Sequence, residues 1–562
     1  MIERGFKGGA RPHATTVALA ALLSACGGGG GGTAPSAPPA PAALTISGTA
    51  ATGAAMAAAT VQIKCAGGTG TATTAADGSY TASITGASLP CVLSAASGTT
   101  TLRSVAEAGS ASSATVNITP LSEIITAKLA GGDASTLFTT FDAAAQAKLT
   151  ATGLADARVA VTAALKGTVD LTGVDPIKDP LVAATTGKAG NELDKKLDAL
   201  GASLKAAGVS VADVGAALVA NPTAPAVVQG LMQPAATSCA ALRSGTYFGL
   251  DAYASVPVEK LRIDAGKLTV TNAANEVTQM AAVPNSACAY TGESGGVQAF
   301  VAKSGVVVVR YAVSASVSRL MLMVPEQAVP LSELAGTWNI VSYAAPAAGG
   351  IPVPGYSVQT LNAASLTTAG ADCVGLKACE PWTPRASDIF AISPDGGYVL
   401  NDDQGSVRAF PVKTAAGQMA VFAIILDTKK LPLGMAVLSR QEALALPAVD
   451  QVDTIWDLLA TPAGAQAAAV VQTKIKSVNT VEQSYTRERP SDGRVDGFEI
   501  NKPRKGLRYR AAGSSIGSSG QAVSFSEMIA TPLPGMGLTV YTSVTGSTQG
   551  QANFLGLSIA KP

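Results

Sequence analysis

The spacing of apolar residues changes twice along the chain and divides it into three regions. In residues 44–118, apolar and polar residues alternate in short runs such as ATVQIKC and GSYTASI. Alternation with a period of two is typical of half-buried β-strands, and the Asp77-Gly78 pair is a hairpin-type turn signal. This region therefore predicts a small β-sandwich built from hairpins.

Residues 119–235 repeat their apolar positions every three to four residues instead. Thr119-Pro120 and Asp133 are expected to begin helices over LSEIITAKLA and DASTLFTTFDAAAQAKLTA. Ser210 and Asp213 have the spacing of a capping box. One further helix carries an apolar stripe, which we interpret as core, at Leu193, Leu197, Leu200 and Leu204. The region predicts an Ala-rich helical bundle.

Residues 236–562 return to β-branched and aromatic runs separated by Gly, Asn and Pro. Val297–Ser304 matches Val407–Thr414, and Gly245-Thr246-Tyr247 is echoed by Gly336-Thr337-Trp338. This repetition predicts two or three related antiparallel units. Gly336-Thr337-Trp338 also resembles the Gly-x-Trp of the first strand in lipocalin-like barrels. The fold class is therefore mainly β and multidomain: a small sandwich, a helical bundle, and a large antiparallel region that forms a lipocalin-like barrel or tandem β units.

The first 25 residues have the pattern of an export signal. Arg4, Lys7 and Arg11 precede the apolar run Thr15–Leu23, which is too short to cross about 30 Å of hydrocarbon. Leu23-Ser24-Ala25-Cys26 resembles the lipobox of bacterial lipoproteins, which implies that Cys26 is lipidated and becomes the first residue. Residues 26–43 are rich in Gly and Pro and predict a flexible tether.

The lipoprotein resemblance also implies a location. Because Gly27 rather than Asp follows the cysteine, it favours anchoring in the outer membrane, facing either the periplasm or the exterior. Within the first β region, Gly48 followed by AATVQIKC and TTAADGSYTASI is similar to the carboxypeptidase-regulatory-like (transthyretin-like) domain. That resemblance implies a sandwich that serves as a spacer or binding module at a bacterial surface.

Composition restricts the chemistry. The chain has one histidine, His13, which lies inside the predicted signal, so the mature protein would lack the imidazole of serine triads and of histidine–zinc sites. A net charge of +1 argues against nucleic acid as a partner. We expect no cofactor.

The cysteine count agrees with an exported protein. Of seven cysteines, Cys26 is the lipidation candidate, and an even number remains for disulfides. Fifteen pairings of six cysteines are possible in principle. Pairing of neighbours is favoured because each pair then lies within one predicted region: Cys65 with Cys91, Cys239 with Cys288, and Cys373 with Cys379.

One basic segment is a candidate anion-binding site. If residues 502–510 form a strand, alternate positions on one of its faces carry Lys502, Arg504, Arg508 and Arg510. Four cations in a row could bind the phosphates of lipopolysaccharide or an acidic polysaccharide. The alternative is a solvated strand face paired with the upstream carboxylates Asp492, Asp496 and Glu499.

Other motifs are weaker. Asn401, Asp402 and Asp403 could offer oxygen ligands to a cation, although a solvated turn explains them better. Residues 513–517 match Gly-x-Ser-x-Gly but lack a histidine partner. A carboxylate-pair hydrolase needs no histidine, yet none of several acidic residues is favoured for that role: Asp251, Glu259, Asp388, Asp395 and Asp450.

The sequence thus favours a lipid-anchored cell-envelope protein with a non-enzymatic binding or structural role. The alternatives are a histidine-independent hydrolase acting on polysaccharide and a module that binds polyanions such as lipopolysaccharide. The expected partners are the bilayer, through acylated Cys26, and an envelope polysaccharide or another surface protein.

Overall fold

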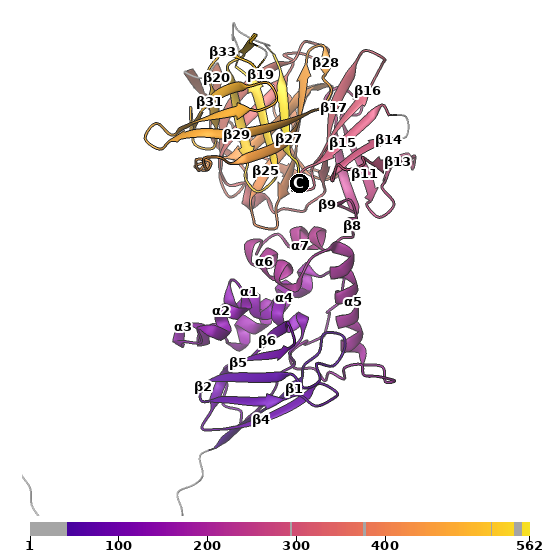
Figure 1. The fold of residues 1–562 in the computed structure, drawn as a ribbon, viewed down its shortest axis with the longest axis vertical. Coiled ribbons are helices and arrows are strands. Elements are labelled where there is room, and N and C mark those ends of the chain that lie inside the picture. The colour runs from indigo at the N-terminus through magenta and orange to yellow at the C-terminus, as the bar shows by residue number, and fades with distance from the viewer. Residues whose placement is uncertain (1–41, 293–294, 375–377, 519, 545–552) are drawn as a thin grey trace, which may run out of the picture. The chain divides into compact units, whose positions relative to one another are not determined.

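The computed structural model describes residues 42–562, except 293–294, 375–377, 519 and 545–552 (Figure 1). The predicted signal, Cys26 and most of the tether lie outside the described residues. The described part is mainly β, with antiparallel sheets and seven α-helices, which confirms the predicted fold class.

The first β region contains two small sheets, one in the order β4-β1-β7 and the other β3-β2-β5-β6. Side chains alternate between buried and exposed along β4, as the period-two pattern predicted. The strands are β1 (Ala43–Thr49), β2 (Thr60–Gly67), β3 (Thr69–Thr73), β4 (Ser79–Thr85), β5 (Ser88–Ser97), β6 (Thr100–Ala106) and β7 (Ser113–Thr115).

The turn and the disulfide of this region each have a definite place relative to the two sheets. The Asp77-Gly78 turn connects β3 and β4, which belong to different sheets, so it is a crossing between sheets and not a hairpin. Gly78 has φ +80°, and a Cβ there would come within 2.5 Å of the Ala50 carbonyl oxygen. The Cys65–Cys91 disulfide joins directly opposite residues of neighbouring strands β2 and β5. It therefore reinforces one sheet and does not link the two sheets.

The helices follow the caps found in the sequence. Thr119 caps α1, and Ser210 with Asp213 forms a capping box on α6. The single helix expected after Asp133 is three shorter ones, because Asp142 and Thr150 each cap a new start. The helices are α1 (Pro120–Ala130), α2 (Ala134–Thr139), α3 (Ala143–Gln146), α4 (Ala151–Ala164), α5 (Glu192–Ala207), α6 (Val211–Ala220) and α7 (Pro225–Leu231).

The leucine stripe of α5 belongs to a hydrophobic core that the helices share with the two sheets. Leu193, Leu197 and Leu200 are buried there, and Leu204 packs at its edge. In the described part of the chain, no single helix has the length and apolar composition needed to cross a membrane. Only α5 and α6 taken together meet that test, and they are bent by 84°.

Residues 245–325 form a closed barrel of eight antiparallel strands, here called barrel 1 (Figure 1, pink). It follows the short hairpin β8 (Ala235–Ala236) and β9 (Cys239–Arg243). Its strands are β10 (Gly245–Leu250), β11 (Val258–Asp264), β12 (Thr269–Thr271), β13 (Val277–Ala282), β14 (Ala289–Gly292), β15 (Val297–Val301), β16 (Val307–Ala312) and β17 (Ser318–Pro325).

Residues 336–440 form a nine-stranded antiparallel sheet, here called sheet 2, preceded by the 3-10 helix η1 (Leu331–Leu334). Its edge strands are β21 and β22. The strands are β18 (Gly336–Ala344), β19 (Val353–Leu361), β20 (Thr367–Val374), β21 (Ala378–Trp382), β22 (Ala391–Ile392), β23 (Tyr398–Asn401), β24 (Gly405–Lys413), β25 (Met419–Asp427) and β26 (Pro432–Arg440).

Residues 452–560 form a second closed ring, here called barrel 3 (Figure 1, orange to yellow), in which β27 pairs with both β29 and β37. Strand β28 (Gly464–Ala465) and the hairpin of β33 (Gly513–Ile516) and β34 (Ala522–Phe525) are additions to the ring. The ring strands are β27 (Val452–Thr461), β29 (Ala469–Asn479), β30 (Ser484–Arg489), β31 (Arg494–Ile500), β32 (Arg508–Arg510), β35 (Met528–Leu533), β36 (Leu538–Ser543) and β37 (Leu555–Ala560).

The three units share one connection: in each, the first strand pairs antiparallel with the last. The repeated segments found in the sequence are β15 and β24, each the third strand from the end of its unit. The aromatic residue of each first strand is buried, namely Tyr247, Trp338 and Trp456.

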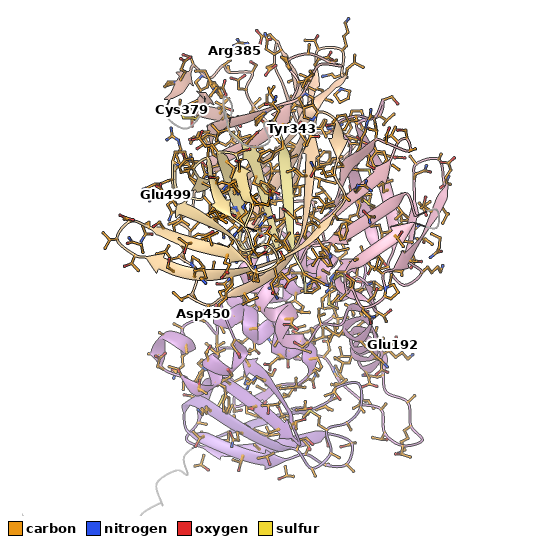
Figure 2. All side chains as sticks on the ribbon, turned by 45° about the horizontal axis from the view of Figure 1, so that its top comes forward. Glu192, Tyr343, Cys379, Arg385, Asp450 and Glu499 are labelled. Carbon is orange, nitrogen blue, oxygen red and sulfur yellow. A yellow bond between two sulfur atoms is a disulfide. The ribbon has the colours of Figure 1, made fainter. Side chains whose placement is uncertain are left out.

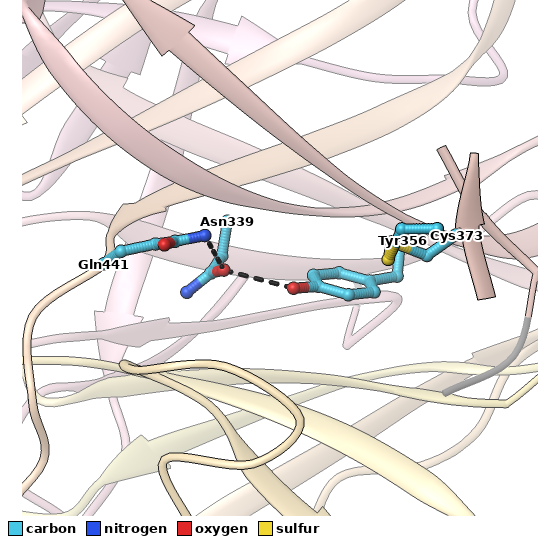
Figure 3. The surroundings of a disulfide bond; sticks show 5 residues. Asn339, Tyr356, Cys373 and Gln441 are labelled. Carbon is cyan, nitrogen blue, oxygen red and sulfur yellow. Dashed lines mark hydrogen bonds between the residues drawn. A yellow bond between two sulfur atoms is a disulfide. The ribbon is translucent and has the colours of Figure 1, made fainter. Parts of the chain in front are cut away.

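The remaining disulfides join the neighbouring cysteines that chain order favoured. Cys239 of β9 pairs with Cys288 of barrel 1, and Cys373 pairs with Cys379 across the β20–β21 hairpin. Figure 3 shows the second of these beside Tyr356, whose hydroxyl donates to Asn339 Oδ1 at 3.2 Å. The same oxygen accepts from Gln441 Nε2 at 3.0 Å. Burial raises the pKa of Tyr356 to about 12, against the lowering influence of nearby Arg504.

Candidate anion-binding site

Barrel 3 contains a cavity of about 360 Å³. Alternate residues of its strands line this cavity, because successive side chains of a strand point to opposite faces. On β27, for example, Ile455, Asp457 and Leu459 face the cavity, whereas Trp456 and Leu458 pack into a hydrophobic core outside it. Each strand of the ring therefore has one face toward the cavity and another face toward the outside of the ring.

Five arginines from three neighbouring strands line the cavity. Strand β30 carries two of them and β32 carries two, and the fifth lies at the start of β31. In the strand register, Arg489 lies directly opposite Arg494. These residues are Arg487, Arg489, Arg494, Arg508 and Arg510.

One fully buried carboxylate, Asp496, holds three of these guanidinium groups. It accepts a hydrogen bond from Arg494 Nε at 2.7 Å, and its oxygens lie 3.4 Å from Arg487 Nη2 and 3.6 Å from Arg510 Nη1. Burial by itself would raise the pKa of this carboxyl, but the three positive charges outweigh burial and lower it. Asp496 is therefore an ionised anchor for the cationic wall.

Arg510 is the most deeply buried of the five, with 6% of its surface exposed. Desolvation lowers its pKa to about 10, although Asp496 opposes that shift. Arg510 Nη2 donates to the Ser526 carbonyl at 2.9 Å. Its Nε has no hydrogen-bond partner among the described residues, and neither does the buried Nε of Arg487 or Arg489. Such donors are costly to leave unpaired in a protein interior.

The other carboxylate of the cavity, Asp457, is held by hydroxyl groups. Its Oδ1 accepts from Tyr541 Oη and from Ser558 Oγ, both at 2.7 Å. Burial, and then the negative charge of Asp457, raise the pKa of the Tyr541 hydroxyl well above its ordinary value. Tyr541 thus stays a neutral donor.

The charges of the cavity do not balance. Among the described residues, Arg489 and Arg508 form no ion pair. Five guanidinium groups face two carboxylates, Asp457 and Asp496, which leaves an excess of three positive charges. An uncompensated charge excess in a partly desolvated cavity favours the binding of an anion.

The β33–β34 hairpin contributes an aromatic cover to this wall. Its last residue, Phe525, lines the cavity, and its ring centre lies 4.8 Å from the guanidinium of Arg494 and 4.9 Å from that of Arg510. Contacts of this kind stabilise a guanidinium that is withdrawn from water. The Gly-x-Ser-x-Gly motif lies in β33 and the turn after it, a hairpin without the helix that a nucleophile elbow requires.

Apolar residues line a further part of the cavity. Some of them, such as Phe498, Met528 and Ala530, belong to a hydrophobic cluster inside the barrel. The apolar residues that line the cavity are Ile455, Leu459, Ala467, Ala469, Val471, Phe498, Phe525, Met528, Ala530 and Phe554. The strand register places Met528 and Ala530 directly opposite Arg510 and Arg508, so apolar and cationic side chains lie next to one another in this site.

The four basic residues that were expected on one strand face lie in different places in the structure. Strand β32 covers only residues 508–510, so Arg508 and Arg510 face the cavity while the other two precede the strand. Lys502 pairs with Glu499 at the surface, where Figure 2 labels the carboxylate. Arg504 is exposed and lies near Tyr356, whose pKa its positive charge acts to lower. The expected single strand face with four cations is therefore not found. The ion pair between Asp496 and Arg510, which the alternative interpretation expected, is present.

The other candidate residues have separate surroundings. Asp403 pairs with Arg385, and Asp402 accepts from the amides of Gln404 and Gly405. Asn401 Oδ1 accepts from Lys430 Nζ at 3.1 Å. In the described residues, no group of three or more His, Cys, Asp or Glu could hold a metal ion. The cavity is lined by none of the carboxylates named for hydrolysis: Asp251, Glu259, Asp388, Asp395 and Asp450.

Three cavity arginines escaped the sequence analysis, namely Arg487, Arg489 and Arg494. Thr486 and Glu488 occupy the other face of β30, so both faces are polar and the pattern does not show which face is inside. One signal was available. A hairpin turning at residues 490–493 would place Arg489 opposite Arg494, and like charges at opposed positions are unfavourable unless an anion lies near them.

Comparisons with known proteins identify no family. No protein-family model and no curated protein matches the chain. One solved structure with some likeness is a protein of unknown function from the DUF3598 family of Nostoc punctiforme. It has 8% identity and a TM-score of 0.16, and the match covers 41% of this chain and 97% of that one. Another is a candidate outer membrane protein of Bacteroides fragilis, with 9% identity and a TM-score of 0.15, covering 42% and 99%.

Proposed function

We propose that this protein is a binding protein of the bacterial envelope whose barrel 3 holds a small anionic ligand. The observation that carries the proposal is the excess of arginine over carboxylate in one cavity, with Arg489 and Arg508 outside any ion pair among the described residues. Guanidinium groups donate paired hydrogen bonds to carboxylate, sulfate and phosphate oxygens.

Binding is favoured over hydrolysis by the state of the cavity carboxylates. A carboxylate-pair hydrolase needs one acid with a raised pKa to donate a proton. The pKa of Asp496 is instead lowered by the three guanidiniums around it. Asp457 is occupied by the hydroxyls of Tyr541 and Ser558. This arrangement supports holding an anion.

The anchoring part of the proposal rests on the sequence. The lipobox-like Leu23-Ser24-Ala25-Cys26 and the Gly/Pro-rich segment after it support attachment to the outer membrane through an acylated Cys26. The transthyretin-like region would then serve as a spacer. Cys26→Ser is expected to move the protein from the membrane to the soluble fraction, and retention of this variant in membranes would count against lipidation.

Anion binding is tested by titrating the full chain with 1-anilinonaphthalene-8-sulfonate at low salt and following its fluorescence. Arg489→Gln and Arg508→Gln should each weaken binding about tenfold, since a hydrogen bond to a charged group contributes roughly 1.5–3 kcal/mol. Arg262→Gln is the matched control, because Arg262 is an exposed arginine of barrel 1. Equal affinities in all four proteins would refute the site.

Salt dependence provides an independent readout. The charges of a partly open cavity are screened by added salt, so the affinity should fall as NaCl rises from 20 to 300 mM, where the screening length shortens from about 20 Å to about 6 Å. A dye that binds only through apolar contacts would keep its affinity or gain from salt. That result would locate the dye elsewhere and contradict the proposal.

A further inference from the structure

We infer that the ligand of barrel 3 is an organic dianion with an apolar body, of which a phosphate monoester is the simplest example. This inference rests on the proposed anion site and adds the charge and the shape of its occupant. Both follow from the residues that line the cavity.

The charge comes from the two arginines outside the Asp496 cluster. Asp496 engages Arg487, Arg494 and Arg510, so the two cavity arginines that have no carboxylate partner among the described residues are Arg489 and Arg508. A single negative charge would leave one of these guanidiniums uncompensated. A dianion compensates both, and its several oxygens can accept paired hydrogen bonds from the two guanidinium groups.

The apolar body is inferred from the apolar residues that lie beside the arginines. Phe498, Met528 and Ala530 belong to the hydrophobic cluster within the barrel and also border the cavity, and Met528 and Ala530 lie opposite Arg510 and Arg508 in the strand register. An inorganic ion bound by the arginines would leave these apolar side chains against water. An alkyl or aromatic group bound there removes apolar surface from water at roughly 25 cal/mol for each Å².

The volume limits the size of that body. A cavity of about 360 Å³ corresponds to roughly a dozen groups the size of a water molecule, at about 30 Å³ each. An octyl phosphate, with its eight carbons and one headgroup, is of that order. A polysaccharide or a whole lipopolysaccharide molecule would exceed the cavity, so the structure favours a soluble ligand of low molecular mass.

The test varies charge and tail separately by calorimetric titration of the full chain at pH 8, where a phosphate monoester carries two charges because its second pKa is about 6. Octyl phosphate, octyl sulfate, octanol and inorganic phosphate are compared below their aggregation concentrations. Octyl phosphate should bind at least tenfold more tightly than any of the other three. In the Arg508→Gln variant, octyl phosphate should lose most of its higher affinity relative to octyl sulfate. In the Arg262→Gln variant, the difference in affinity should be unchanged.

The outcomes separate this inference from the function on which it rests. Equal binding of octyl phosphate and inorganic phosphate would overturn the apolar body, and equal binding of octyl phosphate and octyl sulfate would overturn the dianion, while the anion site would stand in both cases. If no anion binds, the proposed function also falls. Sedimentation with phosphatidic acid vesicles, but not with phosphatidylcholine vesicles, would assign the phosphate monoester to bilayer lipid and contradict a soluble ligand.

Discussion

Barrel 1 and barrel 3 have the same ring plan and opposite interiors. In barrel 1, Phe248 points outward and lies 4.6 Å from Phe410 of sheet 2, so its neighbour Tyr247 faces inward. The strand register places Leu261 opposite Tyr247 and Met323 opposite Val307, and all four are buried. The corresponding face of barrel 3 carries arginines around a buried aspartate.

The difference shows which part of the molecule fixes the fold and which part is free to vary. Closure of each ring depends on backbone hydrogen bonds between its first and last strands, β10 with β17 and β27 with β37. Those bonds do not depend on the inward side chains. An apolar interior then stabilises barrel 1 by packing, whereas barrel 3 can hold a charged cavity because its outer face already packs into a hydrophobic core.

The largest effect is expected from Asp496→Asn. This change removes the carboxylate that three buried guanidiniums share, so the free energy of unfolding should fall by about 3–5 kcal/mol. Urea denaturation measures the loss. The control is Asp450→Asn, since Asp450 is 74% exposed in its pair with Lys474 (Figure 2) and solvent screens that pair, so this change should have little effect on stability. Equal costs for the two variants would mean that the buried cluster does not stabilise barrel 3.

Leu261→Ala tests the other interior. Removing this buried side chain of barrel 1 should cost about 2–5 kcal/mol through lost apolar contact and the cavity left behind. Because packing involves no charge, the cost should be the same at 20 and 500 mM NaCl, whereas the cost of Asp496→Asn should change with salt. A marked salt dependence of Leu261→Ala would show that the two interiors are less different than their side chains indicate.

Acid should destabilise barrel 3 by a smaller amount, through protonation of Asp496. The folded-state pKa of Asp496 lies below its ordinary value, so in acid the folded protein binds fewer protons at this site than the unfolded chain. Its stabilising contribution is fully present above about pH 5 and is lost as the pH falls through the folded-state pKa. Urea titrations between pH 6 and 2.5 should therefore show wild type approaching Asp496→Asn. A gap that stays constant to pH 2.5 would contradict this assignment.

The smallest effect is expected from Phe525→Leu. This substitution keeps an apolar side chain but removes the aromatic face that lies over Arg494 and Arg510. The loss should be about 0.5–2 kcal/mol by urea denaturation. Phe300→Leu is the companion variant: Phe300 packs against Trp456, and among the described residues no cation lies over the Phe300 ring itself, so its cost should depend less on salt. A salt-independent loss at Phe525 would indicate packing alone.

Much of the fold could be predicted from local patterns, and the site only in part. The caps at Thr119, Asp133 and Ser210 were visible because capping depends on residues close in sequence. The pairing of β27 with β37 was not, since it joins residues about a hundred positions apart. Arg508 and Arg510 were found as a basic alternation, but their inward direction depends on that distant closure.

Because the last strand closes the ring, the cavity of barrel 3 forms late in the folding of the chain. Strand β37 (Leu555–Ala560) completes the ring and supplies Ser558, a donor to Asp457. If the chain is exported from its N-terminus, barrel 1 has all of its strands long before β37 emerges from the membrane, and N-terminal domains generally fold first. The cavity can therefore form only after the rest of the β region has been exported. A chain truncated before Leu555 would display the arginines of barrel 3 without the closed ring that surrounds them.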